Sequence, residues 1–306
     1  MYDTIIIGTG PAGLAAAIYG TRAKLDMLVL EQNYMSGGQV VNTYEVDNYP
    51  GLPGISGVDL SMKFREHAEK LGAEVIRTKV EKIDKKEDGT FTVVTEDNTY
   101  DTRTVLLAAG AHHRKLGAKG EEEMAGMGVS YCATCDGAFY KGSDVAVIGG
   151  GDVAVEDAIF LARGCSKVYV VHRRDELRAA KSLQEKLFSL ENVEVVWDSV
   201  VDQIAGEEQV EAVHLSNVKD GSKKTIDVDG VFIAVGITPD SQLLQGMVEL
   251  NQGSYVKADE TCMTSVPGIF AAGDVRTKDL RQIITAASDG ANAIFSIQKY
   301  LIRDII

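Results

Sequence analysis

The feature that most constrains the fold is a sequence unit that occurs twice, 141 residues apart, with Gly8 of the first copy matching Gly149 of the second. In each copy a short apolar stretch leads into a glycine-rich turn, a helix-like segment and a second apolar stretch, over residues 4–30 and 145–171. Continuous apolar, β-branched runs predict parallel strands buried on both faces. A strand that enters a helix through such a turn predicts a dinucleotide-binding βαβ unit. The sequence therefore predicts an α/β protein with two such units, and its 306 residues suffice for two domains.

The first turn, Gly8-Thr9-Gly10-Pro11-Ala12-Gly13, has the full G-x-G-x-x-G pattern. Its first glycine permits the tight turn, its second lets the main chain approach a pyrophosphate, and its third allows close packing of helix on strand. The N-terminus of the following helix holds the anion. Glu31 ends the second apolar stretch and is placed to accept hydrogen bonds from a ribose diol. The expected ligand is a nucleotide with a free ribose diol, such as FAD.

The second turn, Gly149-Gly150-Gly151-Asp152-Val153-Ala154, repeats this pattern but leads to a different strand end. Where the first unit has Glu31, the second has His172-Arg173-Arg174, with Arg178 one helical turn further on. An acid there repels a 2′-phosphate, whereas guanidinium groups bind one bidentately. The second unit is therefore predicted to prefer NADP(H) to NAD(H). The alternative is a solvated basic cluster at a helix start, which is less expected in a chain of net charge −14.

Two cysteines, in Cys132-Ala133-Thr134-Cys135-Asp136, lie a short step before the second turn. A zinc site needs a second pair of Cys or His ligands, and Cys165 and Cys262 are isolated, so no metal site is expected. An inert structural disulfide is disfavoured in a cytosolic protein. A redox dithiol remains. Asp136 is placed to shuttle the proton taken up when a disulfide sulfur leaves as a thiol; alternatively, it is a turn residue before a glycine.

Charge and hydropathy exclude some classes of protein. With 45 acidic against 31 basic residues, the chain lacks the basic face typical of a nucleic-acid-binding protein. No apolar run approaches transmembrane length, and the first residues lack the features of a signal peptide. We therefore expect a cytoplasmic protein that binds neither nucleic acid nor a membrane.

Other segments offer groups to a cofactor. The apolar stretches 104–110 and 230–236 predict strands ending at Gly110 and Gly236, where the main chain can approach a ligand. Polar loops at 36–40 and 45–51 either line a cofactor or form ordinary turns, and residues 58–72 predict an amphipathic helix.

The C-terminal part contains two further candidates. Asp274, after a short apolar stretch, is placed to bind a ribityl hydroxyl. Arg281 begins a predicted helix that reaches about Tyr300. The partial positive charge of its N-terminus would stabilise a reduced, anionic isoalloxazine.

Together these motifs closely resemble the low-molecular-weight thioredoxin reductases of the pyridine nucleotide–disulfide oxidoreductase family. The most specific element is the dithiol just before the second glycine turn, since larger members of the family carry theirs in the first unit. The motifs that match in order and spacing are Gly8-Thr9-Gly10-Pro11-Ala12-Gly13, Gly38-Gln39, Cys132-Ala133-Thr134-Cys135-Asp136-Gly137, Gly149-Gly150-Gly151-Asp152, His172-Arg173-Arg174, Ala272-Gly273-Asp274 and Arg281-Gln282.

The resemblance implies two Rossmann-like three-layer dinucleotide-binding domains, the second inserted into the first. FAD would be bound by residues 1–113 and 246–306, and NADPH by residues 114–245, which also carry the dithiol. The resemblance further implies a homodimer in which the NADPH domain rotates about hinges at 111–117 and 244–248. It also implies a mechanism: NADPH reduces the flavin, the flavin reduces the disulfide through Cys135, and Cys132 attacks the disulfide of thioredoxin.

Motifs and resemblance together give the expected site residues. The catalytic residues are Cys132, Cys135 and Asp136. The residues expected to bind FAD are Gly8, Gly10, Pro11, Ala12, Gly13, Glu31, Gly38, Gln39, Asn48, Val80, Gly110, Asp274, Arg281, Gln282 and Ile283. Those expected to bind NADPH are Gly149, Gly151, Asp152, Val153, His172, Arg173, Arg174, Arg178 and Gly236.

One position departs from the family pattern, and other functions stay open. Val153 stands where relatives usually have Ser or Thr near the pyrophosphate, which removes a hydroxyl contact to NADPH. A related flavin disulfide reductase would use another donor or acceptor, such as ferredoxin, a glutaredoxin-like protein or a peroxidase-linked protein. Relatives that use ferredoxin lack the basic cluster and the glycine fingerprint, and this chain has both. A further alternative is a redox sensor whose disulfide switches a partner without turnover.

Overall fold

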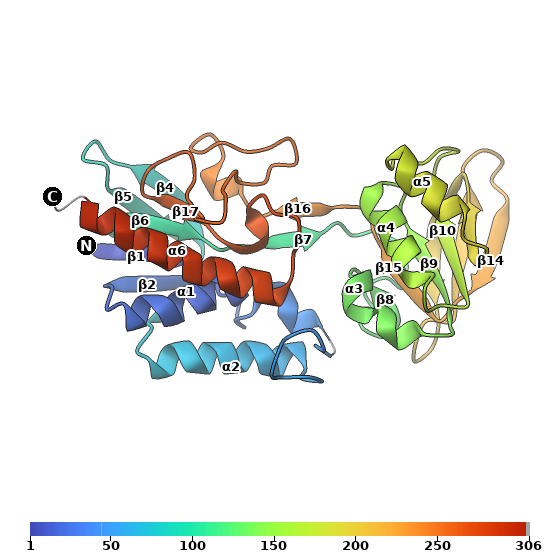
Figure 1. Ribbon diagram of the computed structural model, residues 1–306, viewed down its shortest axis with the longest axis horizontal. Helices are drawn as coiled ribbons and strands as arrows, with labels where there is room; N and C mark the ends of the chain where they lie inside the picture. The colour runs from blue at the N-terminus through green and yellow to red at the C-terminus, as the bar shows by residue number, and fades with distance from the viewer. Residues whose placement is uncertain (44, 304–306) are drawn as a thin grey trace. The chain divides into compact units, whose positions relative to one another are not determined.

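The computed structural model describes residues 1–43 and 45–303, and the chain divides into two compact units. The first unit comprises Met1–His112 and the described residues from Thr238 on, and the second comprises His113–Ile237. Each unit has its own mainly parallel sheet (Figure 1). The predicted α/β class, with one Rossmann-like unit inserted into another, is therefore confirmed.

The first unit is a sheet of seven strands with helices packed on it. Its central strands are parallel, and a hairpin extends one side antiparallel. The strand order is β3 (Val75–Arg77), β2 (Met27–Glu31), β1 (Tyr2–Ile7), β6 (Thr99–Leu107), β5 (Phe91–Thr95) and β4 (Val80–Lys85), with β17 (Ile269–Ala271) paired to β6. The helices are α1 (Pro11–Arg22), α2 (Gly57–Lys70) and α6 (Ile283–Arg303), with short 3₁₀ helices η1 (Gly38–Asn42), η3 (Gln242–Leu244) and η4 (Gly273–Val275).

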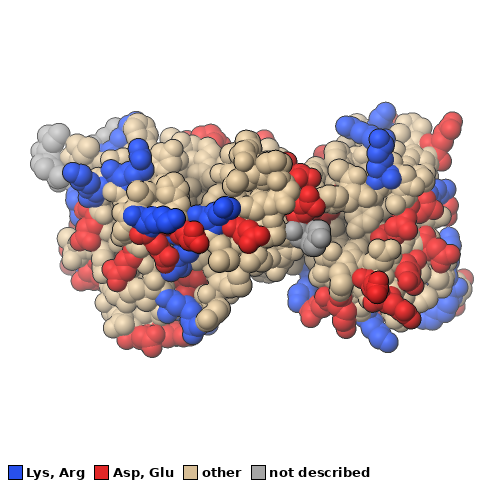
Figure 2. All heavy atoms as spheres, turned by 90° about the horizontal axis from the view of Figure 1, so that it is seen from below, with Lys and Arg blue, Asp and Glu red and all other residues tan. Residues whose placement is uncertain are grey.

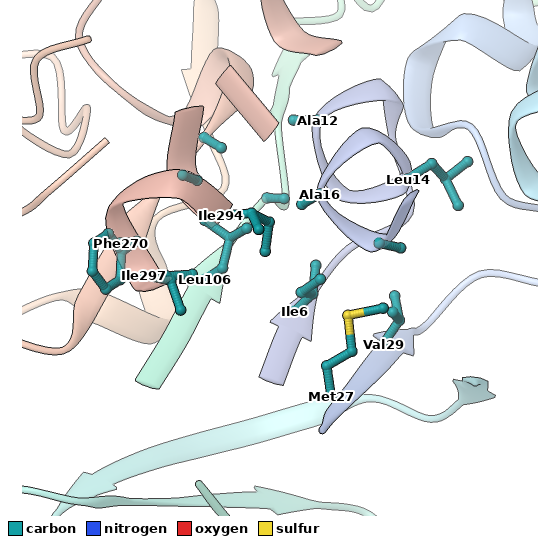
Figure 3. Close-up of a cluster of buried hydrophobic side chains, with 14 of the residues drawn as sticks. Ile6, Ala12, Leu14, Ala16, Met27, Val29, Leu106, Phe270, Ile294 and Ile297 are labelled. Atoms are coloured by element: carbon teal, nitrogen blue, oxygen red, sulfur yellow. The ribbon is translucent and has the colours of Figure 1, made fainter. Parts of the chain in front are cut away.

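Alternation of side chains along β1 builds two apolar layers in this unit. Ile6 packs into a core shared with α1 and α6, which lie side by side over the sheet (Figure 3). Ile5 and Ile7 face the opposite side and pack with residues of the hairpin and of the segment after η3. This arrangement gives the predicted three layers, because a parallel strand needs apolar cover on both faces.

The second unit repeats the design on a smaller scale. Its five-stranded parallel sheet is accompanied by a three-stranded antiparallel sheet. The parallel order is β11 (Val193–Val196), β10 (Lys167–Val171), β9 (Asp144–Ile148), β15 (Gly230–Ile233) and β8 (Val129–Ser130); the antiparallel strands are β12 (Ser199–Ala205), β13 (Ala212–Asn217) and β14 (Lys223–Asp227). The helices are α3 (Ala133–Asp136), α4 (Asp152–Leu161) and α5 (Lys181–Phe188), with the 3₁₀ helix η2 (Gly137–Tyr140).

The chain passes between the units twice, and the two passages pair with each other. They are β7 (Ala111–His113) and β16 (Ile237–Pro239), which form a two-stranded sheet. The first passage falls within the expected hinge at 111–117. The expected second hinge at 244–248 is wrong, because this segment belongs to the first unit, where Leu244 and Val248 are buried in its core.

The predicted cofactor domains, 1–113 with 246–306 and 114–245, concern which segments bind which cofactor, and they stay a prediction. The return passage at 237–238 lies before their predicted boundary at 245–246. Tyr44 and residues 304–306, which fall inside the predicted FAD domain, lie outside the described residues.

Several predicted element bounds shift by a few residues. The strands expected to reach Gly110 and Gly236 end at Leu107 and Ile233, and the last helix begins at Ile283. In α1 the helix already begins at Pro11, because proline is favoured at the first helical position, where its missing N–H has no intrahelical partner to lose.

The close approach of α1 and α6 makes Gly290 a sensitive position. An added Cβ at Gly290 would lie 2.1 Å from the carbonyl oxygen of Ala12, so we expect Gly290→Ala to force the helices apart and destabilise the protein by roughly 1–3 kcal/mol. Gly164→Ala is the matched control, because no described atom outside its own chain neighbours lies within 4 Å of a Cβ there. Urea unfolding followed by far-UV circular dichroism measures both, and equal midpoints for the two variants would contradict this packing.

Candidate functional site

The first glycine turn leaves room for a ligand at one position only. A Cβ at Gly13 would lie 1.9 Å from the carbonyl oxygen of Gly8, and one at Gly8 would lie 2.5 Å from that of Ala108. At Gly10, by contrast, no described atom beyond the chain neighbours lies within 4 Å of a Cβ position. Gly10 is also the N-cap of α1, and no described side chain caps this helix. Open space beside uncapped N–H groups fits a pyrophosphate.

Glu31 is buried at the end of β2 and is held by four donors. One carboxylate oxygen accepts from the main-chain N–H and the hydroxyl of Thr9, and the other accepts from Asn33 N at 2.7 Å and Nδ2 at 2.9 Å. A carboxylate offers about four acceptor positions, so a ribose hydroxyl has to displace one of these donors. Thr9 and Asn33 are the side chains that can give up a hydrogen bond to Glu31, and neither was among the predicted site residues.

A cavity of about 370 Å³ in the first unit is lined by residues at or beyond the ends of β2, β3 and β5. None of its residues was among the predicted site residues, because they come from separate loops without a motif. They are Gln32, Asn33, Arg77, Thr78, Lys79, Glu96 and Asp97. Its proximity to Glu31, through the Asn33 side chain, fits the nucleoside end of a dinucleotide.

Asp274 presents a buried oxygen without a partner. Its Oδ1 accepts no hydrogen bond from any described residue, and burial raises the pKa of the carboxyl group. The neighbouring Gly273 lies against both α1 and α6, since a Cβ there would lie 3.0 Å from the Cβ of Ala12 and 3.8 Å from that of Ala286. An unsatisfied buried acceptor costs free energy unless a ligand supplies the donor. A ribityl hydroxyl is such a donor.

A buried ion cluster fixes the segment that carries Asp274. Asp289 on α6 accepts hydrogen bonds from Gly273 N, from Arg276 Nε and Nη2, and from Lys278 Nζ, at 2.7–2.9 Å. Burial alone would raise the pKa of Asp289, but hydrogen bonds from Arg276 and Lys278 outweigh it and lower the pKa. The cluster therefore holds η4 against α6 and orients Asp274.

Other residues expected to bind FAD lie in several places of the first unit. Gly38 lies beside the first turn, because its Cβ position is 3.7 Å from the Cα of Gly10. Asn48 Nδ2 donates to Gln282 Oε1 at 2.9 Å, which joins two predicted residues 234 positions apart. The guanidinium of Arg281 stacks over the ring of Tyr255 at 4.4 Å.

The remaining predicted FAD residues are spread over β4, η1, the start of α6 and the segment after β6. Gly110, after the end of β6, has a positive φ of 77°, a backbone conformation that favours glycine. The Val80 side chain is buried in the core, so a contact to a cofactor would come from its main chain. Gln39 lies in η1, next to Gly38, and Ile283 is the first residue of α6.

The second glycine turn repeats the close main-chain packing and the open position of the first, but its middle glycine, Gly150, contacts His172. Gly149 packs on the main chain of Ala234, its Cβ position lying 2.5 Å from the carbonyl oxygen, and no described atom beyond its chain neighbours lies within 4 Å of the Gly151 Cβ position. A Cβ on Gly150 would lie 2.3 Å from the imidazole of His172, so the ring lies flat against this glycine. His172 is 5% exposed, and burial lowers its pKa, so the imidazole is neutral at pH 7.

The basic residues after β10 are available to an anion. On the face drawn in Figure 2, acidic and basic side chains lie close together. In the second unit, the exposed Lys219 forms ion pairs with Asp175 and Asp198. Arg173, Arg174 and Arg178 are exposed, and no acidic side chain of the described chain forms an ion pair with any of them. Unpaired guanidinium groups at this strand end fit a 2′-phosphate.

The loop that carries these arginines is tied to the glycine turn. Arg178 N donates to the carbonyl oxygen of Gly150 at 2.7 Å, and Ala180 N donates to Asp152 Oδ1 at 2.8 Å. The Asp152 carboxylate therefore anchors the loop that carries the arginines, through its hydrogen bond from Ala180 N. Val153 is 56% exposed on the first turn of α4 and brings no hydroxyl, and the Gly236 Cβ position lies 3.6 Å from the side chain of Arg114.

Cys132 and Cys135 form a disulfide at the start of α3, with an S–S distance of 2.08 Å and a Cα–Cα distance of 5.3 Å. Both cysteines are half-buried, whereas Cys165 and Cys262 are free and buried. The described residues contain no group of three or more His, Cys, Asp or Glu side chains that could hold a metal ion. A closed, accessible pair of this kind is suited to thiol–disulfide exchange.

Hydrogen bonds fix the chain on both sides of the disulfide. Ser130 Oγ donates to Asp136 Oδ2 at 2.6 Å and accepts from Cys132 N at 3.0 Å. Tyr131 Oη donates to the buried Glu121 at 2.7 Å, and Glu121 also accepts from two main-chain N–H groups at 116–117. Burial raises the pKa of Asp136, and the Ser130 hydrogen bond opposes this shift. Ser130 and Glu121 were not among the predicted site residues, because neither belongs to a motif.

Asp157, one turn beyond the start of α4, is a half-buried carboxylate with no hydrogen bond or ion pair to any described residue. Burial, with a smaller contribution from Glu156, raises its pKa to about 6. The raised pKa means that the folded state holds this proton more tightly than the unfolded state. Asp157 therefore favours folding below about pH 4, and this contribution is lost as the pH rises through about 6.

We expect Asp157→Asn to stabilise the protein at pH 7.5 by up to about 3 kcal/mol and to have little effect near pH 4. Urea unfolding at the two pH values measures the difference. Glu156→Gln, at the exposed neighbouring position, is the control and should change the free energy of unfolding by less than about 0.5 kcal/mol. An equal gain for Asp157→Asn at both pH values would contradict the assignment.

Comparison with known proteins agrees with this geometry. The family model described as pyridine nucleotide-disulphide oxidoreductase matches residues 2–290. The thioredoxin reductase of Listeria innocua is 49% identical over 303 residues, covering 98% of this chain and 94% of that protein, and that of Bacillus subtilis is 46% identical over 304 residues, covering 98% and 95%. The crystal structure of thioredoxin reductase from Streptococcus pyogenes has a TM-score of 0.95 and 47% identity over 99% of both chains. The chain therefore belongs to the pyridine nucleotide-disulphide oxidoreductase family and, within it, to the thioredoxin reductases.

Proposed function

We propose that this protein uses NADPH to reduce the disulfide of thioredoxin, through bound FAD and the Cys132–Cys135 couple. The observation that carries the proposal is this half-buried disulfide, located just before the second glycine turn. The segment after β10 adds Arg173, Arg174 and Arg178, which form no ion pair with any described residue. The relatives described above are named thioredoxin reductases, which supports the same acceptor.

The reaction balances as a two-electron transfer. One NADPH and one proton reduce one thioredoxin disulfide to a dithiol and leave NADP⁺. FAD, when bound, supplies the conversion of a hydride into an electron pair that a disulfide accepts. The pair enters at Cys135 as the Cys132–Cys135 bond breaks, and Asp136 delivers a proton to the sulfur that leaves. Cys132 returns this proton to Asp136 as it attacks the partner's disulfide as a thiolate, and Cys135 then releases the partner by closing the bond to Cys132 again. The two partner sulfurs leave as thiols, carrying the proton derived from the hydride and the one proton of the overall reaction.

The residues present fit both cofactors. In the first unit, open space at Gly10, the carboxylate of Glu31 and the orphaned oxygen of Asp274 are suited to the pyrophosphate, ribose and ribityl chain of FAD. In the second, open space at Gly151 and the guanidinium group of Arg173, with those of its neighbours, are suited to NADPH.

The proposal places the protein in the cytoplasm, with thioredoxin as its macromolecular substrate and without nucleic-acid or membrane partners. None of the helices in the described part of the chain combines the length and apolar character that crossing a membrane requires. The excess of 14 negative charges supports a partner other than nucleic acid.

A Cys135→Ser variant tests the electron path. We expect NADPH to bleach the bound flavin at the parental rate, while thioredoxin reduction falls on the order of a thousandfold because the acceptor sulfur is missing. Flavin absorbance and a thioredoxin-coupled disulfide dye measure the two steps. Cys165→Ser, at a buried free thiol, is the control and should behave like the parent. Equal thioredoxin reduction by Cys135→Ser and the parent would refute the relay.

The same assay separates the alternatives. Reduced ferredoxin replacing NADPH as donor, or a glutaredoxin-like or peroxidase-linked protein replacing thioredoxin as acceptor, would indicate a related reductase. A purified protein whose flavin NADPH does not bleach would indicate a redox sensor.

The basic cluster predicts the choice of nucleotide. In the double variant Arg173→Ala, Arg174→Ala, we expect the KM for NADPH to rise roughly 10- to 100-fold, because charge-assisted hydrogen bonds to the 2′-phosphate are lost. The KM for NADH should change less than about threefold, since NADH has no such phosphate. Steady-state kinetics with both nucleotides measures the two KM values. An equal rise in KM for NADPH and NADH would contradict binding of the 2′-phosphate by these arginines.

A homodimer is part of the proposal. Ile284, Phe295 and Ile302 are exposed by 43%, 59% and 59% and lie along one face of α6. Large apolar side chains gathered on one exposed face favour a protein partner, and the family resemblance makes a second copy the expected one. Phe295→Asp should halve the mass in light scattering, whereas the control Phe188→Asp, at a 56% exposed position of the second unit, should not. A parental mass for Phe295→Asp would contradict an interface on this face.

A further inference from the structure

We propose that Ser130 is a positioning residue for the disulfide chemistry: its hydroxyl holds the Asp136 carboxyl group and the Cys132 amide in one fixed arrangement. This inference rests on the proposed function, because it assigns Ser130 a role in delivering the proton that the disulfide takes up on reduction. No motif in the sequence indicates it.

The geometry fixes which hydrogen bond the Ser130 hydroxyl accepts and which one it donates. Its oxygen lies 2.6 Å from Asp136 Oδ2 and 3.0 Å from Cys132 N. The amide can only donate, so the hydroxyl accepts from it and directs its single proton to the carboxylate. The 3.4 Å separation between Ser130 Oγ and the carbonyl oxygen of Cys132 is too long to compete.

The sheet fixes the main chain of Ser130. It is the last residue of β8, pairs with Phe232 of β15 and is 6% exposed. A buried hydroxyl on a paired strand loses little further conformational entropy when it bonds. Ser130 thus ties the carboxyl group at the end of α3 and the amide at its start to a paired strand.

The chemistry explains why this position matters. Breaking the Cys132–Cys135 bond places two electrons on the sulfurs, and a sulfur that leaves as a thiol takes a proton, which Asp136 supplies. The acid works only in its protonated form. A donated hydrogen bond stabilises the carboxylate and so lowers the pH at which Asp136 loses its proton. Ser130 thereby sets the pH range over which the proton can be delivered.

Other titratable groups lie near Asp136. On η2, Tyr140 has its pKa raised by burial and by Asp136. On α4, which packs against α3, Asp152 and Glu156 are exposed and Asp157 is half-buried.

On the strand side of the site, Glu121 and Asp229 already accept hydrogen bonds. Tyr131 is bonded to Glu121 and stacked with His113, and Asp229, before β15, accepts from Asp144 N at 3.1 Å. Asp157 is the neighbouring carboxyl group whose pKa burial raises to about 6.

The test uses the full-length, flavin-loaded protein as parent and as Ser130→Ala. Thioredoxin reduction is measured from pH 5 to pH 9, with flavin bleaching by NADPH recorded separately. We expect unchanged bleaching and an apparent pKa for loss of thioredoxin reduction that is higher by roughly one unit, because the carboxylate loses its donor. The fall in thioredoxin reduction at high pH is the alkaline limb of the pH profile. Asp136→Asn should lack this limb. Ser130→Thr, which keeps the hydroxyl, should show the limb at the parental pH.

Two controls isolate the effect. Ser199→Ala removes a hydroxyl of similar burial in the same unit, one that donates to the carbonyl oxygen of Trp197, and should leave the profile unchanged. Asp157→Asn should also leave the limb in place, which separates its titration from that of Asp136. A purely structural role for Ser130 would lower the rate at all pH values without moving the limb.

A second measurement needs neither NADPH nor thioredoxin. In protein reduced with dithiothreitol, the pH dependence of cysteine alkylation by iodoacetamide should show the Asp136 titration, moved upward by the same amount in Ser130→Ala. If the parent fails to reduce thioredoxin, the proposed function is wrong and alkylation still decides the role of Ser130. An unmoved limb in both measurements overturns the inference; if Ser130→Ala does not fold, Ser130→Gly takes its place.

Discussion

The packing of main chain directly against main chain at the two glycine turns is the constraint on which the rest of the structure depends. The third glycine of the first turn approaches the first so closely that no side chain fits between them, and Gly149 packs on the main chain of Ala234 in the same way. Because the strand end and the helix start are pressed together, the first N–H groups of the helix face open space at Gly10 and Gly151. This contact positions both of the proposed cofactor sites, including the strand ends proposed to bind the ribose.

The two units differ in a pair of positions that change together. In the first unit Thr9 donates to Glu31; at the matching positions of the second, Gly150 leaves room for the ring of His172. A threonine in place of Gly150 would collide with that imidazole, and a glycine in place of Thr9 would remove a hydroxyl donor from the carboxylate. The nucleotide preference that we propose for each unit therefore rests on one turn position, Thr9 or Gly150, as well as on the strand-end residue, Glu31 or His172.

The sequence predicted the elements with strong periodicity or a motif. Buried strands such as β1 and β9, the helices that follow the glycine turns and the disulfide were all identified, because each depends on local pattern. The second hinge was misplaced, because the return passage is set by pairing of β16 with β7, a long-range contact that leaves no local pattern. Ser130 and Asn33 were missed for the same reason: a serine at a strand end and an asparagine in a turn are common, and only the fold shows which groups they meet.

The two cysteines outside the disulfide have a practical consequence. Cys165 and Cys262 lie in separate cores, and burial raises the pKa of both thiols, that of Cys262 to about 12. Buried, protonated thiols react slowly with electrophiles. A thiol-directed reagent added to the reduced protein therefore labels Cys132 and Cys135 selectively. The amount of label per chain then measures the fraction of chains with an intact redox centre.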